Sequence, residues 1–314
     1  MAAGAQVPTR RTCHFRLRLG GICLYDHPFQ ALELEAVFDQ ANGASPPLRL
    51  DGVPPEIDGV RCTYRYNGEA GQSVARAPGW IRYVRRRYRR FYVEVGGSFA
   101  DYLRRHNTKS RNTQGRKVRH FMRLSGREDC LREFKEPGEM EEFHRLACEV
   151  SRRSYQGRVL RAGIPETAGY RDELVSQARQ EGVRGYILMY GDMPAAYGLC
   201  RKRGGVLTYE KTGFDPALAP LHPGSVLLYL LLERTFRCGD IRIFDFGPGE
   251  FEYKARMATG SVPCMDVYLF RRNLSNLLLT LTDFITSRTW GVIQRVLELL
   301  GIRAKLRGLI YRNL

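Results

Sequence analysis

The strongest structural pattern in the chain lies in residues 222–257, HPGSVLLYLLLERTFRCGDIRIFDFGPGEFEYKARM. Leucines at helical spacing predict a helix over residues 225–237, and Gly239 can cap its end in a left-handed conformation. A short apolar strand, residues 241–244, follows and ends in Asp245. Because two glycines, two glutamates and a Tyr-Lys pair come directly after it, we expect this strand to turn sharply into a short helix that carries polar side chains.

The start of the predicted helix has the features of an anion-binding site. The first turn of any helix presents unpaired N–H groups and the positive end of the helix dipole. No acidic side chain occupies the turn that begins at Pro223, Gly224 and Ser225, and the glycine lets a ligand approach the backbone. A phosphate or pyrophosphate would be held well there. The same three residues are also typical of an ordinary helix start.

Strand and helix patterns upstream indicate the fold class. Residues 186–190, 195–202 and 206–212 are predicted strands, joined by Gly-Asp and Gly-Gly pairs that are typical of turns and hairpins. Apolar residues at helical spacing predict two helices, over residues 138–155 and 170–181. This order of elements predicts an α+β fold with an antiparallel meander.

The first third of the chain has a weaker pattern. Residues 1–98 are predicted to form short strands and turns, because Pro-Pro pairs and glycines interrupt them repeatedly. Residues 91–95 fit a buried strand, whereas the arginines before them alternate poorly and predict an exposed edge or a loop. Residues 99–124 fit a long helix. Gly115 weakens that helix by about 1 kcal/mol relative to alanine, so two helices are an alternative.

Positive charge is concentrated in one part of the sequence. The net charge is +17, and residues 76–127 contain sixteen Lys or Arg but only two acids, Glu94 and Asp101. Such a block attracts anions such as phosphates, nucleic acid, acidic lipid or an acidic sugar polymer. A solvated basic face is an equally good interpretation.

The C-terminal segment, residues 273–314, combines an apolar stripe with basic residues. The stripe comprises Leu277, Leu281, Phe284, Ile285, Val292, Ile293, Val296, Leu299 and Leu300, and the basic residues are Arg303, Lys305, Arg307 and Arg312. The favoured interpretation is a helix that packs on the protein's own sheet. A peripheral membrane contact is the alternative.

Composition limits the class of protein. The eight cysteines are at least ten residues apart and show no metal-ligand spacing, so we expect neutral thiols and no metal site. The N-terminus lacks the apolar core of a signal peptide. The longest apolar run, residues 226–232, is far shorter than the about 20 residues of a membrane-spanning helix. We therefore expect a cytoplasmic protein, or alternatively one attached peripherally to the inner face of the membrane.

Several motifs occur together in this sequence. They are YLRRHNTKSRNTQGRKVRHFMRL (102–124), GDMPAAYGLC (191–200), and GFDP, PGS, FDFGPGE and YK within residues 209–257. In combination they resemble the GNAT superfamily, in the double-GNAT branch that includes the Fem-type peptidyltransferases and the cellulose-biosynthesis acetyltransferase family. The resemblance covers about residues 90–300.

The resemblance implies an architecture of tandem GNAT-like halves, each a mixed, mostly antiparallel sheet flanked by helices. A degenerate N-terminal half would cover residues 1–125, and the acyltransferase half would cover residues 126–272. A basic amphipathic helical tail, residues 273–314, would follow.

The resemblance also implies transfer of an acyl group from acyl-CoA, with acetyl-CoA the favoured donor, to an amine without a metal. Lys254 would neutralise the oxyanion or a nearby phosphate. Tyr253 would protonate the leaving thiolate or merely pack, and Asp245 would orient Lys254, accept the amine proton or cap the turn. Glu210 is a weaker candidate base. Expected donor-binding residues are His222, Pro223, Gly224 and Ser225, and expected substrate-binding residues are Arg111, Asp215 and Glu250.

Three interpretations of function follow. The first is an N-acyltransferase acting on an amino sugar or amino compound of an envelope or extracellular polysaccharide. The second is an aminoacyl-tRNA-dependent Fem-type transferase, whose binding of RNA would suit the basic block. No segment keeps heptads long enough for the coiled-coil arm of some Fem-type proteins. The third is a non-catalytic module that binds an anionic polymer or a membrane.

Overall fold

The computed structural model describes residues 9–19, 22–38, 50–66, 73–154 and 163–299. Contacts divide the chain into two compact units. Unit 1 comprises Met1–Tyr88 and Pro263–Leu314, and unit 2 comprises Arg89–Val262. Two strands, β5 (Trp80–Glu94) and β11 (Gly260–Arg271), each begin in one unit and end in the other. The division at residues 125 and 272 that the sequence suggests stays a prediction.

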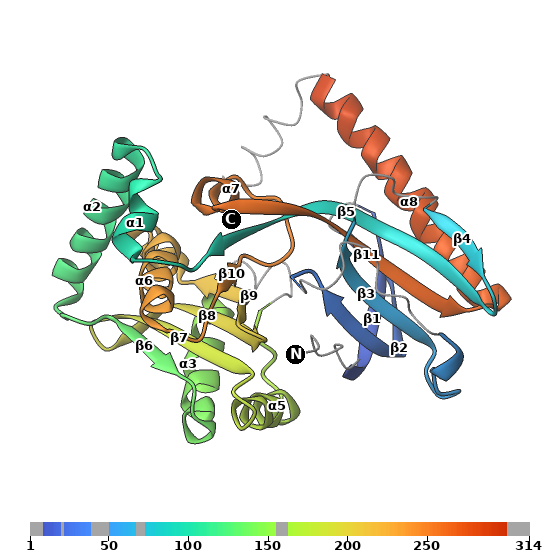
Figure 1. Cartoon of the computed structure of the whole chain (residues 1–314), viewed down its shortest axis with the longest axis horizontal. Helices are drawn as coiled ribbons and strands as arrows, with labels where there is room; N and C mark the ends of the chain where they lie inside the picture. Colours follow the sequence, from blue (N-terminus) through green and yellow to red (C-terminus); the bar gives the residue numbers. More distant parts are fainter. Residues whose placement is uncertain (1–8, 20–21, 39–49, 67–72, 155–162, 300–314) are drawn as a thin grey trace. The chain divides into compact units, whose positions relative to one another are not determined.

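Unit 1 is a sheet with one long helix on a face (Figure 1). Its strand order is β1-β2-β3-β11-β5, with β4 paired to β5. The elements are β1 (Thr9–Leu19), β2 (Ile22–Ala36), η1 (Leu50–Gly52), β3 (Gly59–Arg65), β4 (Val74–Ala77) and α8 (Leu274–Leu299). Phe15, Tyr83 and Phe270 form a buried cluster with Leu279 of α8. A second cluster, which includes Val60, lies elsewhere in the same unit.

The strands of unit 1 differ from the sequence prediction. Three of them are long, since β1 has 11 residues and β2 and β5 have 15 each, whereas β3 and β4 are short, with 7 and 4 residues. The arginine-rich half of β5 is also part of the strand and not a loop. Its arginines find carboxylates far away in the sequence, because Arg85 Nε donates to Asp283 at 3.0 Å and Arg86 Nε donates to Asp266 at 2.9 Å. Partners so distant in the sequence cannot be recognised from a local hydrophobic pattern.

The helix α8 is oriented differently from the prediction. Of the apolar stripe expected to pack on the sheet, Phe284 packs there, whereas Leu277, Leu281 and Ile285 are exposed. Val292, Ile293 and Val296 are exposed too. The side chain of Leu299, together with Leu300, Arg303, Lys305, Arg307 and Arg312, lies outside the part of the chain that can be described.

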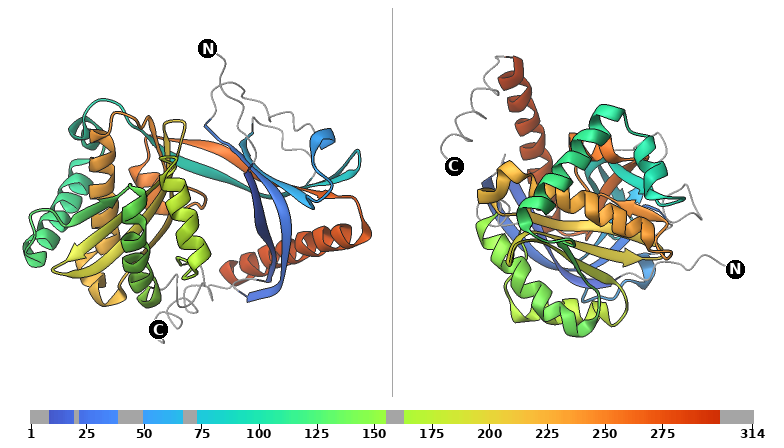
Figure 2. Two further views of the ribbon diagram at one scale, coloured as in Figure 1. Left: turned by 90° about the horizontal axis from the view of Figure 1, so that it is seen from below. Right: turned by 90° about the vertical axis from the view of Figure 1, so that its left-hand side faces the viewer.

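Unit 2 is a mixed sheet covered by helices on both faces. The end of β5 continues the order β5-β10-β9-β8-β7-β6. The strands are β6 (Leu131–Phe134), β7 (Val183–Tyr190), β8 (Met193–Arg203), β9 (Val206–Phe214) and β10 (Ile243–Asp245). The helices are α1 (Phe99–Arg104), α2 (Thr108–Ser125), η2 (Pro137–Glu139), α3 (Met140–Arg153), α5 (Ala168–Ala178), η3 (Pro216–Leu221), α6 (Pro223–Arg237) and α7 (Glu252–Met257). As Figure 2 shows, α2 and α6 cover one face, and α3 and α5 cover the other.

The predicted α+β class is confirmed, and so are both hairpin turns. Strands β7, β8 and β9 pair antiparallel across Gly191 and across Gly204-Gly205, and these three glycines have positive φ. The pairing of β10 with β9 is parallel, which the sequence analysis did not predict. It makes β9–α6–β10 a βαβ unit, in which the helix connects two neighbouring parallel strands. The division into tandem GNAT-like halves stays a proposal.

The predicted long helix over residues 99–124 is two helices, but the break is not at Gly115. It lies at residues 105–107, where Asn107 caps α2 by accepting a hydrogen bond from the Ser110 N–H at 2.8 Å. The side-chain cap stabilises the start of α2 at this point, and Gly115 is accommodated inside that helix.

Two further sequence expectations concern membranes and thiols. Among the described helices, none combines the length and the apolar character needed to cross a bilayer. All eight cysteines are described and are free thiols, and most are buried. Burial raises the pKa of Cys62 to about 12 and that of Cys130 to about 11, which keeps both thiols neutral.

Candidate active site

The main candidate site is a cavity of about 730 Å³ within unit 2. Its walls come from α1, α2, β9, the start of α6, and α7. The volume is typical of sites that bind small molecules or cofactors. Its lining includes six of the predicted site residues: Arg111, His222, Pro223, Gly224, Ser225 and Tyr253.

The N-terminus of α6 opens on this cavity. Pro223 occupies the first helical position, no acid lies in the first turn, and His222 makes no side-chain capping bond. His222 itself has φ 54° and ψ 46°, a left-handed conformation that is uncommon for a residue other than glycine. Burial lowers the pKa of His222, and the positive charge of Lys117 lowers it further. The helix start therefore faces the cavity as an electropositive, uncapped end.

Helix α2 supplies cations to the opposite wall. Lys109, Arg111 and Lys117 all line the cavity. Their positions follow from the Asn107 cap, because it fixes where α2 begins and so which of its residues face α6. Tyr102 of α1 also lines the cavity, and its hydroxyl donates to the carbonyl oxygen of Met257 at 2.7 Å, which ties α1 to the end of α7.

The floor of the cavity is the end of β9, beyond the point where its parallel partner stops. The β9–β10 register ends at the pair Thr208–Asp245, while β9 continues to Phe214. Tyr209, Thr212 and Phe214 line the cavity. The Tyr209 hydroxyl donates to Thr212 Oγ1 at 2.6 Å. This part of β9 thus lacks β10 as a neighbour and offers an open strand edge.

Glu210 lies at an irregularity of the same strand. The β8–β9 register shifts between Leu199 and Cys200, which pair with Lys211 and Tyr209, so Glu210 is left without an opposite residue. Such a bulge redirects the local side chains. The Glu210 carboxylate forms an ion pair with Arg201 and does not belong to the cavity lining.

Asp245 is fully buried and its carboxylate is held by three partners. Arg90 Nε lies 2.9 Å from each of its oxygens, Thr208 Oγ1 donates at 3.0 Å, and the Gly247 N–H donates at 2.9 Å. The aspartate therefore caps the turn after β10 and fixes it to β5 and β9. The sequence analysis did not find Arg90, because nothing in the basic run of β5 distinguishes it from its neighbours.

Lys254 is also buried, with 4% of its surface exposed. Its ammonium donates to the carbonyl oxygens of Pro248 at 2.7 Å and Gly247 at 3.3 Å, and it lies 5.4 Å from the centre of the Phe251 ring. Burial lowers the pKa of Lys254 to about 8, against the opposing effect of Asp245 and with a further lowering by Arg90. Lys254 does not line the cavity; it occupies the inside of the Gly-Pro-Gly turn.

Two glycines make that turn possible. Gly247 has φ +69°, and a Cβ there would come within 2.8 Å of the Tyr209 carbonyl oxygen. Gly249 has φ +100°. Any side chain at Gly247 would push the turn away from β9, so the glycine is required by close packing and by conformation.

Tyr253 directly precedes Lys254 in the sequence, and its side chain points to the cavity. Its side chain lines the cavity and 36% of the residue is exposed. Desolvation raises the pKa of Tyr253, so its hydroxyl keeps its proton at neutral pH. Burial also raises the pKa of the neighbouring Tyr209 well above its usual value.

The two remaining predicted residues lie outside the cavity lining. Asp215 caps η3 by accepting from the Ala217 N–H at 3.0 Å, and it forms an ion pair with Arg153 at 3.1 Å. Glu250 accepts a hydrogen bond from the Arg89 N–H at 2.7 Å. Both carboxylates shape the loops around the site.

Sequence reasoning missed several lining residues. They include Tyr102, Lys117, Tyr209, Thr212 and Arg256. Tyr209 and Thr212 could have been found from the strand period, because they follow the last residue of β9 that pairs with β10. The others depend on how the helices pack on the sheet.

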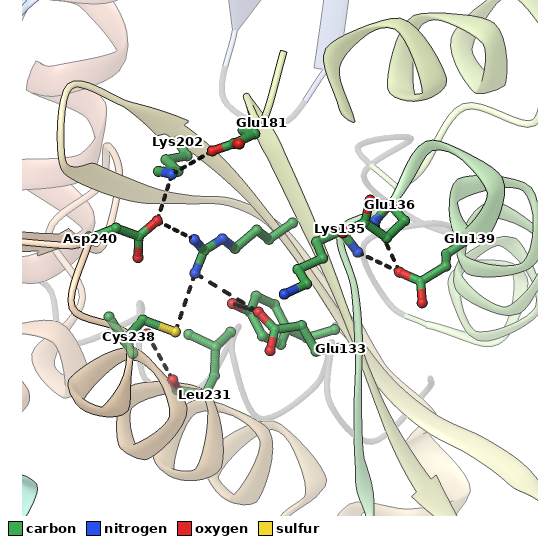
Figure 3. A network of polar contacts seen from close by, with 12 residues as sticks. Glu133, Lys135, Glu136, Glu139, Glu181, Lys202, Leu231, Cys238 and Asp240 are labelled. Atoms are coloured by element: carbon green, nitrogen blue, oxygen red, sulfur yellow. Dashed lines mark hydrogen bonds and ion pairs between the residues drawn. The ribbon is translucent and has the colours of Figure 1, made fainter. Parts of the chain in front are cut away.

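A charged network fixes the opposite end of the βαβ unit. Figure 3 shows Lys202 between Glu181 and Asp240, at 3.3 Å and 2.5 Å. Arg184 donates to Asp240 at 2.6 Å and to the Cys238 sulfur at 3.4 Å. These contacts tie β7 and β8 to the connection between α6 and β10, which keeps the helix start and the strand end in a fixed relation.

A second cavity, of about 670 Å³, adjoins the first. It shares Lys117 and His222 with the main cavity. Its other walls are strongly basic: Arg116, Arg119, His120 and Arg123, with Pro220 and Leu221. Within the described part of the chain, no three His, Cys, Asp or Glu side chains are grouped so as to hold a metal ion.

Comparison with known proteins agrees with this geometry. A family model described as "Acetyltransferase (GNAT) domain" matches residues 108–255, the segment that builds most of the cavity. No curated protein matches the sequence.

Solved structures show a likeness at low identity. FemX is 9% identical with a TM-score of 0.49, covering 87% of this chain and 90% of that one. The C-terminal domain of a putative lysylphosphatidylglycerol synthetase from Agrobacterium fabrum is 11% identical with a TM-score of 0.43, covering 72% of each chain. A GCN5-related N-acetyltransferase from Kribbella flavida is 10% identical with a TM-score of 0.34, covering 69% and 70%. Residues 108–255 of this chain thus match a GNAT acetyltransferase domain.

Proposed function

We propose that this protein transfers an acyl group from acyl-CoA, with acetyl-CoA the favoured donor, to an amine. The observation that carries the proposal is that the uncapped start of α6 and the open edge of β9 share one cavity with Tyr253. A CoA thioester needs these features, because it has a pyrophosphate at one end and an extended amide-containing arm.

The residues that would hold the donor are those at the start of α6. The Gly224 N–H group and the dipole of α6 favour the pyrophosphate, and Lys117 adds a positive charge. The Ser225 N–H donates to the His222 carbonyl oxygen at 3.0 Å. The amides of the pantetheine arm can pair with the free edge of β9, as peptides pair with sheet edges. Arg111 remains available for an anionic group of donor or acceptor.

The chain's own residues also account for the proton movements. A neutral amine attacks the thioester carbonyl, a C–N bond forms and the C–S bond breaks. The leaving thiolate takes the hydroxyl proton of Tyr253, and the tyrosine recovers a proton from the new amide nitrogen. The raised pKa of Tyr253 keeps that proton in place until the thiolate forms. Lys254 holds the turn that presents Tyr253 and contributes a positive charge beside the site.

The acceptor is proposed from the resemblance to the cellulose-biosynthesis acetyltransferase family. It would be an amino sugar or amino compound destined for an envelope or extracellular polysaccharide. The basic walls of both cavities support an acceptor or donor that carries negative charge.

A second candidate, an aminoacyl-tRNA-dependent transfer, is favoured by the second cavity. Its cluster of basic side chains on α2 could bind a phosphate backbone next to the acyl site. The two candidates differ in the donor and not in the reacting residues.

Thermal unfolding with each donor tests the proposal. A ligand that binds the native state raises the unfolding temperature. We expect CoA to raise it and aminoacyl-tRNA to leave it unchanged, and we expect Arg111→Met to reduce the shift. A shift with charged tRNA and none with CoA would support the second candidate. A response to neither would indicate a non-catalytic binding module.

A further inference from the structure

Helix α8 of unit 1 is amphipathic in the reverse sense of an ordinary surface helix. The face that packs on the sheet contains Asn276, Thr280 and Asp283, together with Leu279, and all four are buried. The opposite face is apolar and exposed. We call this face the outer stripe; it comprises Leu274, Leu278, Leu281, Ile285, Val292 and Val296.

The outer stripe runs along one side of the helix, with a gap of about two turns between Ile285 and Val292. At 3.6 residues per turn, its six positions fall within an arc of about 60°. The buried polar residues lie on the opposite side of the same helix. A surface helix normally shows the reverse arrangement, with its apolar side on the core.

The buried contacts fix this orientation. Asp283 accepts hydrogen bonds from the Tyr83 hydroxyl at 2.8 Å and from Arg85 Nε at 3.0 Å. Asn276 Nδ2 donates to the Arg271 carbonyl oxygen at 2.9 Å. A rotation of α8 that buried the outer stripe would separate the Asp283 carboxylate from Tyr83 and Arg85 and leave part-buried Arg85 without its carboxylate partner, which is unfavourable. The helix is therefore built to present apolar side chains outward.

Charges beside the stripe indicate what covers it. Arg288 and Arg295 are exposed along one flank, and Thr282 and Thr289 are exposed along the other. Among the α8 side chains that can be described, the acid is Asp283, which is already paired. Beyond α8, the sequence of residues 300–314 adds four basic residues and no acid.

We propose that the outer stripe docks on a bilayer that contains anionic phospholipid. An interfacial helix inserts an apolar face to the depth of the headgroups and places cationic side chains among anionic lipids. A second copy of this chain fits less well, because the described side chains of two identical stripes would offer the exposed arginines no acidic partner. The surface is in unit 1, so the inference is independent of the acyltransferase proposal.

Cosedimentation of the full-length protein with vesicles tests this inference. The vesicles consist of phosphatidylcholine alone, or of phosphatidylcholine with phosphatidylglycerol. We expect binding to the mixed vesicles, weaker binding to the neutral ones, and loss of binding as salt is raised. Leu278→Glu should weaken binding to the mixed vesicles at least tenfold.

Leu24→Glu is the matched control. Leu24 belongs to β2 of the same unit and is 56% exposed, as is Leu278. The control should bind within threefold of the unsubstituted protein, and both variants should keep its unfolding temperature. Three outcomes overturn the inference: no vesicle binding by the unsubstituted protein, an equal loss in both variants, or a dimer in sedimentation velocity that Leu278→Glu dissociates.

Discussion

The Lys254 ammonium nitrogen lies 2.7 Å from the carbonyl oxygen of Pro248, inside the turn that follows β10. This contact holds the turn and the start of α7 together. Because successive residues of a helix point about 100° apart, the buried Lys254 leaves Tyr253 directed to the cavity. In the proposed mechanism, Lys254 acts by holding the turn and by its charge, and Tyr253 acts on the reacting atoms.

Lys254→Met should lower kcat/KM at least tenfold and change the Kd for CoA less than threefold. The lysine does not line the cavity, so donor binding does not depend on contact with it. Lys254→Arg, which keeps the charge, should recover part of the activity. Steady-state kinetics and calorimetric titration of CoA measure the two effects. Normal turnover by Lys254→Met would remove the lysine from the mechanism.

The titration of Lys254 should be visible in the pH dependence of the unfolding free energy. Its pKa is about 8 in the folded protein, against an ordinary 10.5. Between these two values the folded state has lost a proton that the unfolded state retains, so the unfolding free energy rises with pH. Relative to Lys254→Met, the unsubstituted protein should gain on the order of 3 kcal/mol across this range. Urea denaturation measures it; a flat or falling difference would contradict the burial of a charged lysine.

The pair Arg90–Asp245 should be among the costliest ion pairs to break. Arg90→Met leaves a buried carboxylate without its main partner, which should reduce the unfolding free energy by about 3–5 kcal/mol. The matched control is Arg237→Met on α6, where the exposed pair with Glu233 should contribute about 0.5 kcal/mol. The double variant Arg90→Met/Asp245→Leu should be less destabilised than Arg90→Met. Equal losses in the two single arginine variants would show that the buried pair has no special role.

Gly224→Glu should separate donor binding from folding. An acidic residue in the first turn stabilises α6 by about 0.3–1 kcal/mol through the helix dipole, yet it repels a pyrophosphate at the same place. We expect the Kd for CoA to rise at least tenfold while the unfolding temperature stays the same or rises. Gly224→Ala is the control, because a Cβ there meets Phe214 at an ordinary 3.5 Å. If Gly224→Glu binds CoA normally, the donor phosphates lie elsewhere.

Tyr253→Phe should lower kcat at least tenfold and leave KM within threefold. The substitution removes only the hydroxyl that would protonate the leaving thiolate. Tyr229→Phe is the control, since Tyr229 lines the same cavity and burial raises its pKa as well. Unchanged kcat in Tyr253→Phe would leave that tyrosine a packing role.

The sequence predicted the parts of the fold that depend on local signals. Helix α6 and the hairpins of β7, β8 and β9 follow from leucine spacing and glycine pairs. The parallel pairing of β10 with β9 could not be predicted, because it joins residues 37 positions apart with only three residues in β10. The break between α1 and α2 was misplaced because the new helix begins at the Asn107 side-chain cap, whereas Gly115 lies inside α2.

The candidate site was predicted in part for the same reason. The start of α6, Arg111 and Tyr253 could each be singled out in the sequence, because each belongs to a recognisable motif. The structure brings them together in one cavity. The partners of Asp245 and Lys254 were not recognisable, since Arg90 and the Pro248 carbonyl oxygen are brought to them by the packing of β5 and by the glycine turn. The sequence did not show which face of α8 packs on the sheet, because that face is fixed by the partners of Asp283 on β5.

A crystal structure with bound CoA tests the central claim most directly. We predict density for the pyrophosphate within hydrogen-bonding distance of the Gly224 N–H group, with the thiol end near Tyr253. Density for CoA at any other place in unit 2, or none under saturating CoA, would contradict it.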